Sequence, residues 1–260
     1  MLGTVPNPGL LNSLIKRYYS ETQDSERERV VSSHWREHSS NFDVEFDSEA
    51  NLLSLSGGEF GVCRWNNINH QAMDRLCILS HFLHLGDKRG IIRAMGAAST
   101  VCSRMGFNPT LDVFRQACSL ALMSRHIPQK KKSGDLVFLM IGDGYGVLSA
   151  MTKIMFPRAT VVMVDIGKTM LFQGYYCQVA HPKMTHMLVG ESDRLKGVDF
   201  AYCPADQIDN LNGVDIDIAV NIASMQEMNA KSVDQYFGFL RANLKPNNLF
   251  YCCNRKSKTL

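Results

Sequence analysis

The chain has 260 residues, which is enough to bury one large core or two modest ones. Its composition, 45% hydrophobic and 20% charged, excludes a wholly disordered or fibrous protein. The 28 Lys and Arg residues against 25 Asp and Glu give a net charge of +3, too balanced to indicate a nucleic-acid-binding surface. The eight scattered cysteines contain no C-x-x-C pair and no zinc-type spacing, so we expect reduced thiols and no metal site of that kind.

The beginning of the chain lacks a secretion signal, and no apolar stretch of the sequence is long enough to cross a bilayer. We therefore expect a cytoplasmic protein without membrane insertion. One dense basic run, Lys130 to Lys132, precedes a predicted strand. It is interpreted as a solvated linker, with contact to an anionic partner as the alternative.

The first half of the chain, residues 1–132, is predicted to be a mainly helical region. An amphipathic helix at residues 10–15 precedes a highly charged arm at 21–36, and residues 42–58 suggest a small strand pair that ends in a glycine turn. Apolar residues then recur at helical spacing from 68 to 126, with breaks at 87–88 and 106–109. These breaks divide the stretch into three helices.

The second half, residues 133–260, alternates short apolar runs with helical stretches. Strands are predicted at 136–141, 161–164, 216–220 and 249–253, with a weaker candidate at 198–202, and helices at 147–156, 168–179 and 231–243. This alternation predicts an α/β fold of the Rossmann-like class, a doubly wound and mostly parallel sheet.

A glycine-rich turn joins the first of these strands to its helix, in the order Gly142, Asp143, Gly144, Tyr145, Gly146. Glycine tolerates positive φ and lets the backbone approach a ligand closely. The G-x-G-x-G spacing differs from the G-x-G-x-x-G of dinucleotide folds, whose turn serves a pyrophosphate. The different spacing favours a cofactor without a phosphate, such as S-adenosylmethionine. For that cofactor the turn needs only to pack against the amino-acid and ribose portions.

A second cofactor signal is Asp165, which closes the strand at 161–164 and is followed by Ile166. It lies about twenty residues beyond the turn, where an acidic side chain can accept hydrogen bonds from ribose hydroxyls. Two alternatives stay open: a purely structural turn with Asp165 as a helix cap, and a nicotinamide cofactor.

Two further segments follow predicted strands and are expected at the carboxyl edge of the sheet, where open α/β folds bind ligands. Asp206 and Gln207 follow the weaker strand, and Asp206 is a candidate for the adenine amino group, with a surface loop as the alternative. Asn221 and Ser224 follow the strand at 216–220 and are expected to line the cofactor crevice.

Several segments from about residue 135 to 255 resemble the sugar O-methyltransferases. They are Ile141-Gly142-Asp143-Gly144-Tyr145-Gly146, Val164-Asp165, Leu171-Phe172-Gln173-Gly174-Tyr175-Tyr176, Ser224-Met225-Gln226-Glu227-Met228 and Leu249-Phe250-Tyr251-Cys252-Cys253-Asn254-Arg255. The resemblance implies S-adenosylmethionine as cofactor and methyl transfer to a hydroxyl of a sugar or glycan precursor. The sequence departs from this pattern after Arg255, where only five residues follow instead of an antiparallel strand pair. We therefore expect either a fragment or a sheet truncated after its fifth strand.

A sugar hydroxyl is a poor nucleophile until a base accepts its proton or a metal activates it. Glu227 is the first candidate for this base, and its alternative is a cap of the helix that begins near residue 230. His181 is the second candidate, with His186 beside it, and exposed loop histidines are the alternative. Arg255 is expected to orient a carboxylate or phosphate of the acceptor, or to form an interior ion pair.

The main functional hypothesis is thus an S-adenosylmethionine-dependent O-methyltransferase that acts on a small-molecule or saccharide acceptor. A non-catalytic cofactor-binding or interaction subunit is the alternative, and a nicotinamide oxidoreductase is the third. Metal dependence and assembly are left open, a homo-oligomer included.

Overall fold

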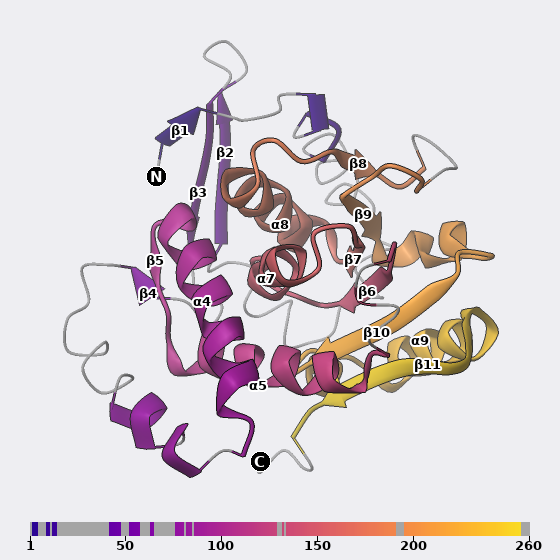
Figure 1. The fold of residues 1–260 in the computed structure, drawn as a ribbon. Coiled ribbons are helices and arrows are strands. Elements are labelled where there is room, and N and C mark those ends of the chain that lie inside the picture. Colours follow the sequence, from indigo (N-terminus) through magenta and orange to yellow (C-terminus); the bar gives the residue numbers. More distant parts are fainter. Residues whose placement is uncertain are drawn as a thin grey trace.

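The computed structural model describes residues 2–4, 9–10, 12–14, 42–47, 52–57, 63–64, 76–80, 82–84, 86–128, 132, 134–190 and 195–255 (Figure 1). Its main feature is a six-stranded sheet with the strand order β11-β10-β6-β7-β9-β8. All of the pairings in this sheet are parallel. The predicted Rossmann-like, doubly wound class is therefore confirmed.

The strands of this sheet alternate with helices along the chain. Their order is β6 (Val137–Ile141), α7 (Val147–Met155), β7 (Thr160–Asp165), α8 (Gly167–Ala180), β8 (His186–Leu188), β9 (Phe200–Pro204), the 3-10 helix η3 (Ala205–Leu211), β10 (Ile216–Ile222), the 3-10 turn η4 (Met225–Glu227), α9 (Ala230–Asn243) and β11 (Leu244–Cys253). From β6 the chain first winds outward through β7 to β9, and then returns to add β10 and β11 on the other side. The reversal occurs between β6 and β10, which is where open α/β sheets bind ligands.

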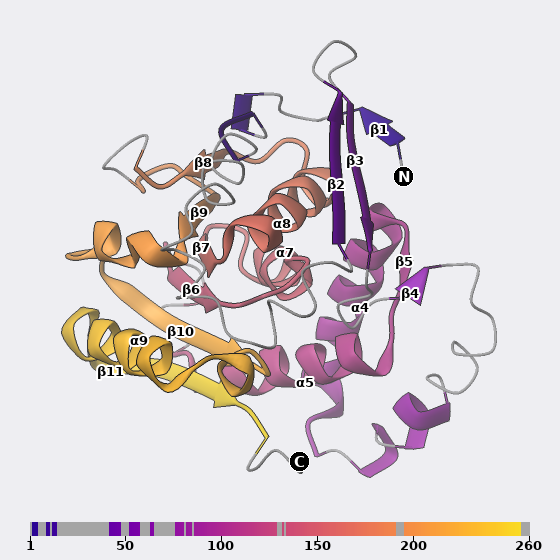
Figure 2. The ribbon, with the colours of Figure 1, turned by 180° about the vertical axis from the view of Figure 1, so that it is seen from behind.

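Side chains of the central strands alternate between two cores, as the period of two along a strand requires. In β6, Phe138 and Met140 belong to one core and Leu139 and Ile141 to the other. The first core is covered by α7, α8 and two helices of the first half, α4 (Lys88–Met105) and α5 (Leu111–His126). The second is covered by η3 and α9 on the opposite face. Figure 2 shows the same layers from behind.

Local signals explain where the first-half helices begin and end. Asp87 caps α4 by accepting a hydrogen bond from the Gly90 N–H at 3.1 Å, and Gly106 ends α4 in the left-handed conformation with φ 78°. Thr110 caps α5 through the Val113 N–H at 3.3 Å. The predicted breaks at 87–88 and 106–109 thus coincide with the helix ends.

The predicted strand pair is also present: β2 (Phe42–Asp47) and β3 (Leu52–Gly57) pair antiparallel, and β1 (Leu2–Thr4) pairs antiparallel with the other side of β3. Helical residues occur at 9–10, 12–14, 76–80 and 82–84. The charged arm at 21–36 and the residues Lys130 and Lys131 lie outside the described residues.

Four differences from the sequence predictions concern strands. Strand β1 was not predicted. The short strand β8 was not predicted, because a run of three residues shows no periodicity. The antiparallel pair of β4 (Cys63–Arg64) and β5 (Phe107–Asn108) was not predicted either. Strand β11 begins at Leu244 rather than 249, and a register shift near Ile216 with a positive φ at Asn247 explains why its first half lacks an apolar pattern.

None of the described helices combines the length and the apolar composition needed to cross a membrane.

Candidate functional site

A cavity of about 380 Å³ lies over the carboxyl ends of β6, β7 and β10. Its volume is within the range of small-molecule sites, about 300–1,000 Å³. Its floor is the glycine turn, one wall is α5 and another is formed by η4 and α9. The predicted site residues that line it are Gly142, Asp143, Gly144, Asp165, Ile166, Ser224 and Glu227, and Arg255 lines it as well.

The glycines of the turn are required by the backbone and by close packing. Gly142, Gly144 and Gly146 have φ of 71°, 58° and 77°, a conformation that other residues rarely adopt. A Cβ atom on Gly142 would lie 1.9 Å from the Oγ atom of Ser224, so the turn is pressed directly against the segment after β10. These contacts bring the ends of β6 and β10 together at the floor of the cavity.

Asp143 points its carboxylate at the first turn of α7. Its Oδ2 atom accepts a hydrogen bond from the Ser149 N–H at 2.8 Å, although the formal N-cap residue is Gly146. Burial raises the pKa of this carboxyl to about 6, against the lowering effect of the helix N–H groups. The positive end of α7 is therefore already neutralised by a side chain of the protein.

Asp165 ends β7 and is nine-tenths buried. Its Oδ1 atom accepts a hydrogen bond from the Ile166 N–H at 2.9 Å, and its Oδ2 atom accepts one from the Gln173 Nε2 at 2.6 Å. Burial first, and the nearby charge of Asp143 second, raise its pKa to about 7. The alternative of a helix cap is not what the structure shows, because the N-cap position of α8 is Ile166.

Glu227 lies in the 3-10 turn η4 and lines the cavity, half-buried. The alternative role as a cap of α9 is filled by Asn229, whose side chain accepts a hydrogen bond from the Ser232 N–H at 2.8 Å. Nearby, the Arg255 N–H donates to Gln226 Oε1 at 2.8 Å, which fixes the end of β11 beside the same turn. Glu227 and Arg255 therefore share one wall of the cavity.

Two predicted cofactor residues of the glycine turn and the β10 end face the protein interior instead of the cavity. Tyr145 is buried, and its ring stacks on Phe172 with centroids 5.1 Å apart. Asn221 is fully buried: its Nδ2 donates to Ile141 O at 2.9 Å, and its Oδ1 accepts from Met225 N and Asn254 Nδ2. Asn221 thus ties β10 to β6 and β11 from behind the crevice, so the prediction that it lines the crevice is not met.

The remaining cofactor predictions also fall outside the lining. Gly146 packs against Cys177, whose Sγ atom would lie 2.7 Å from an added Cβ. Asp206 is exposed, but it lies in the 3-10 helix η3 and not in a loop, and Gln207 follows it; neither lines the cavity, although Ala205 just before them does.

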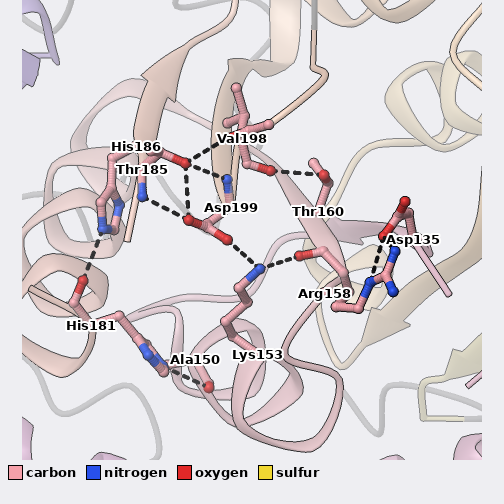
Figure 3. A network of polar contacts seen from close by, with 12 residues as sticks. Asp135, Ala150, Lys153, Arg158, Thr160, His181, Thr185, His186, Val198 and Asp199 are labelled. Atoms are coloured by element: carbon pink, nitrogen blue, oxygen red, sulfur yellow. Dashed lines mark hydrogen bonds and ion pairs between the residues drawn. The ribbon is translucent and has the colours of Figure 1, made fainter. Parts of the chain in front are cut away.

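His181 lies near the amino ends of the strands, whereas the cavity lies over their carboxyl ends. Helix α8 runs antiparallel to the strands, so its last residues reach their amino ends, and His181 is buried there with Nε2 2.9 Å from Ala150 O (Figure 3). His186 is close by, with Nδ1 2.9 Å from the Tyr202 hydroxyl, and burial lowers its pKa to about 4. Neither histidine lines the cavity, so the structure does not bring His181 to the predicted site.

The sequence predictions missed the contribution of α5. Asp112, Arg115 and Gln116 line the cavity from the first half of the chain. Asp112 and Gln116 share one row of this helix at i, i+4 spacing, but Arg115 lies off that row, so the sequence pattern alone does not mark the three as a group. Ala223 was also missed: it lines the cavity with φ 60°, an unusual value for a residue other than glycine.

No protein-family model and no curated protein matches the sequence. Among solved structures, phosphoethanolamine N-methyltransferase 2 of Haemonchus contortus, in complex with S-adenosyl-L-methionine, aligns with a TM-score of 0.36 and 18% identity, over 75% of this chain and 36% of that protein. An O-methyltransferase family protein from Burkholderia thailandensis aligns with a TM-score of 0.37 and 12% identity, over 79% of this chain and 60% of that protein. The chain thus spans less than two thirds of the length of either protein.

Proposed function

We propose that the chain is an S-adenosylmethionine-dependent methyltransferase, and that it transfers the methyl group to a hydroxyl of a sugar or glycan precursor. The observation that carries this proposal is the position of the Asp143 carboxylate on the N-terminus of α7, 2.8 Å from the Ser149 N–H. In dinucleotide-binding folds this helix end receives the pyrophosphate. Here a carboxylate takes that place, which repels a phosphate and suits a cofactor that has none.

The charges of the cavity support the same choice. Four carboxyl groups line it, those of Asp112, Asp143, Asp165 and Glu227, against the guanidinium groups of Arg115 and Arg255. This acidic lining favours a cationic sulfonium ligand over an anionic nicotinamide dinucleotide. The fit extends to the ribose, for which the carboxylate of Asp165 is the proposed acceptor.

When bound, S-adenosylmethionine supplies an electrophilic methyl group on its sulfonium. The protein must then hold the acceptor oxygen in line and accept its proton. Glu227 is the proposed base, since it is the predicted base that lines the cavity. Arg255, at the end of β11, is proposed to orient an anionic group of the acceptor.

The cofactor assignment is tested by isothermal titration calorimetry of the purified chain with S-adenosylhomocysteine and, separately, with NADH. We expect binding of the former and none of the latter. Mixing the protein with labelled S-adenosylmethionine and a panel of nucleotide sugars, followed by mass spectrometry, then identifies the acceptor. Absence of S-adenosylhomocysteine binding would refute the proposal, and tight NADH binding would favour an oxidoreductase.

The role of Glu227 is tested by Glu227→Gln, which keeps the shape of the side chain and removes its basicity. We expect kcat to fall by about 10²–10⁴-fold, the usual contribution of a general base. The affinity for S-adenosylhomocysteine should stay unchanged. Asp234→Asn, on the exposed side of α9, is the matched control. Unchanged turnover of the Gln variant would remove Glu227 from the mechanism; cofactor binding without turnover of any acceptor in the panel would favour the non-catalytic subunit.

A further inference from the structure

The wall of the cavity formed by α5 has an unusual polar composition. Asp112 forms an ion pair with Arg115 and also accepts a hydrogen bond from Gln116 Nε2 at 3.4 Å. All three side chains line the cavity. One turn of a single helix thus presents an anion, a cation and an amide side by side.

The other half of that amide has no protein partner. Gln116 Oε1 is buried and accepts no hydrogen bond from any of the residues that the structure describes. A buried acceptor without a donor costs about 1–3 kcal/mol, a cost that a donor group of a ligand in the adjoining cavity would remove once the side chain turns toward it. A ligand group that pairs with Gln116 Oε1 must carry N–H or O–H.

The two ends of the cavity differ in character. Toward β9 the lining includes the apolar side chains of Ile166, Ala205 and Tyr236, a surface suited to a flat ring such as adenine. Toward α5 it is charged, and Asp112 is close enough to Asp143 to raise the pKa of that carboxyl further, in addition to its burial. With the ribose assigned to Asp165 between these ends, the zwitterionic amino-acid end of the cofactor falls on the α5 side.

We propose that α5 forms the amino-acid subsite of the cofactor site, with Gln116 Oε1 and Asp112 as acceptors for the α-ammonium group and Arg115 as donor to the α-carboxylate. This inference rests on the proposed function. It assigns a cofactor-binding role to the first half of the chain, whereas the glycine turn and Asp165 both belong to the second half.

The test compares two ligands that differ only at that end. S-adenosylhomocysteine carries the amino-acid group, whereas 5′-methylthioadenosine keeps the adenosine and the sulfur but lacks it. Calorimetry on the full-length chain gives both dissociation constants, and their ratio isolates the amino-acid subsite from the rest of the cavity.

For Gln116→Leu we expect the affinity for S-adenosylhomocysteine to fall about tenfold or more, because a hydrogen bond to a charged group is lost. The affinity for 5′-methylthioadenosine should not change. Arg115→Met should have the same selective effect, while Gln116→Glu, which keeps an acceptor oxygen, should retain most of the affinity. Leu122→Gln, on the exposed face of the same helix, is the control and should change neither constant.

Other results would overturn the inference. Equal losses for both ligands in Gln116→Leu would mean that the residue only supports the fold, and thermal unfolding of each variant checks this directly. An unchanged ratio, with weaker acceptor KM instead, would assign α5 to the acceptor. If the wild-type protein binds neither ligand, the proposed function fails together with the inference; if it binds both and Gln116→Leu leaves the ratio intact, only the inference fails.

Discussion

Asp143 and Asp165 are two buried carboxyl groups, and the charge of Asp143 opposes the ionisation of Asp165. Burial raises the pKa of Asp165 to about 7 and that of Asp143 to about 6, and the charge of Asp143 adds to the shift of Asp165. In an unfolded chain an aspartate has a pKa of about 3.9. Because both values are raised on folding, the folded protein binds protons more tightly than the unfolded one.

This difference makes stability depend on pH with a definite sign. The contribution of Asp165 is fully present below about pH 4 and is lost as the pH rises through about 7. We expect Asp165→Asn, which cannot ionise, to lack this loss. Urea unfolding of both proteins, repeated at pH values from about 4.5 to about 8 in steps of about half a pH unit, measures the difference. The variant should gain in free energy of unfolding relative to wild type as the pH rises, and parallel pH curves for the two proteins would contradict the raised pKa.

At the residue scale, the sequence predicted the positions of the turn but not the direction of every side chain. Positive φ at Gly142 and the end of β7 at Asp165 follow from the strand–turn–helix pattern. Tyr145 lies in the glycine turn and Asn221 in β10, yet both face inward, because aromatic packing and the β10–β6 contact decide their orientation. Such choices depend on neighbours far away in the chain, which a local pattern does not contain.

At the element scale, a network of polar contacts fastens α7 to the amino ends of β7 and β9 (Figure 3). The fully buried Lys153 forms an ion pair with Asp199 at 2.5 Å and donates to Ala159 O. Thr185 contributes two further donors to Asp199, its N–H at 2.8 Å and its hydroxyl at 2.9 Å. Burial alone would raise the pKa of Asp199, but Lys153 and Thr185 hold it below its usual value. The network therefore stabilises the sheet at the amino ends of its strands, opposite the cavity.

Removing one member of such a pair leaves the other charge without compensation. We expect Lys153→Met to lower the free energy of unfolding by about 3 kcal/mol, the lower end for buried pairs, because Asp199 is a quarter exposed. The matched control is Arg158→Met, which breaks the exposed pair with Asp135 and should cost less than about 1 kcal/mol. Equal losses for the two variants in urea titrations would show that the buried network has no special weight. The affinity for S-adenosylhomocysteine should be unaffected in both.

The bounds of the helices were easier to predict than the residues of the site. The boundaries of α7, α8 and α9 lie within one residue of the predicted helices, since each helix fills the stretch between two apolar strand runs of the sequence. The role of α5 in the cavity could not be predicted, because helical periodicity identifies the buried face of a helix and not which of its polar residues reach a cavity. That requires knowing that α5 packs beside α7 and β11, where Tyr251 donates to Ser119 Oγ at 3.0 Å.

At the scale of the whole molecule, helices from the first half and the sheet from the second half share one core. Ala97 and Val101 of α4 and Leu120 of α5 belong to the same buried cluster as Leu148 and Met151 of α7. Polar contacts also join the halves, such as Arg104 Nη1 to Ala180 O at 2.7 Å. The division at residues 132 and 133 stays a proposal about how the sequence is organised, and its consequence for folding can be tested.

We expect residues 133–260, produced alone, to show no cooperative thermal unfolding and no binding of S-adenosylhomocysteine. The reason is that the apolar face beneath α4 and α5 would then meet water, at a cost of roughly 25 cal/mol for each Å² exposed. Co-expression with residues 1–132 should restore both properties, since the two pieces can rebuild the shared core, and they should co-purify. Cooperative melting of the 133–260 piece with full affinity would contradict this expectation and establish it as an independent domain. Cooperative melting with weakened S-adenosylhomocysteine but unchanged 5′-methylthioadenosine binding would instead separate the two roles of α5: the sheet folds without the helix, while the amino-acid end of the cofactor site needs it.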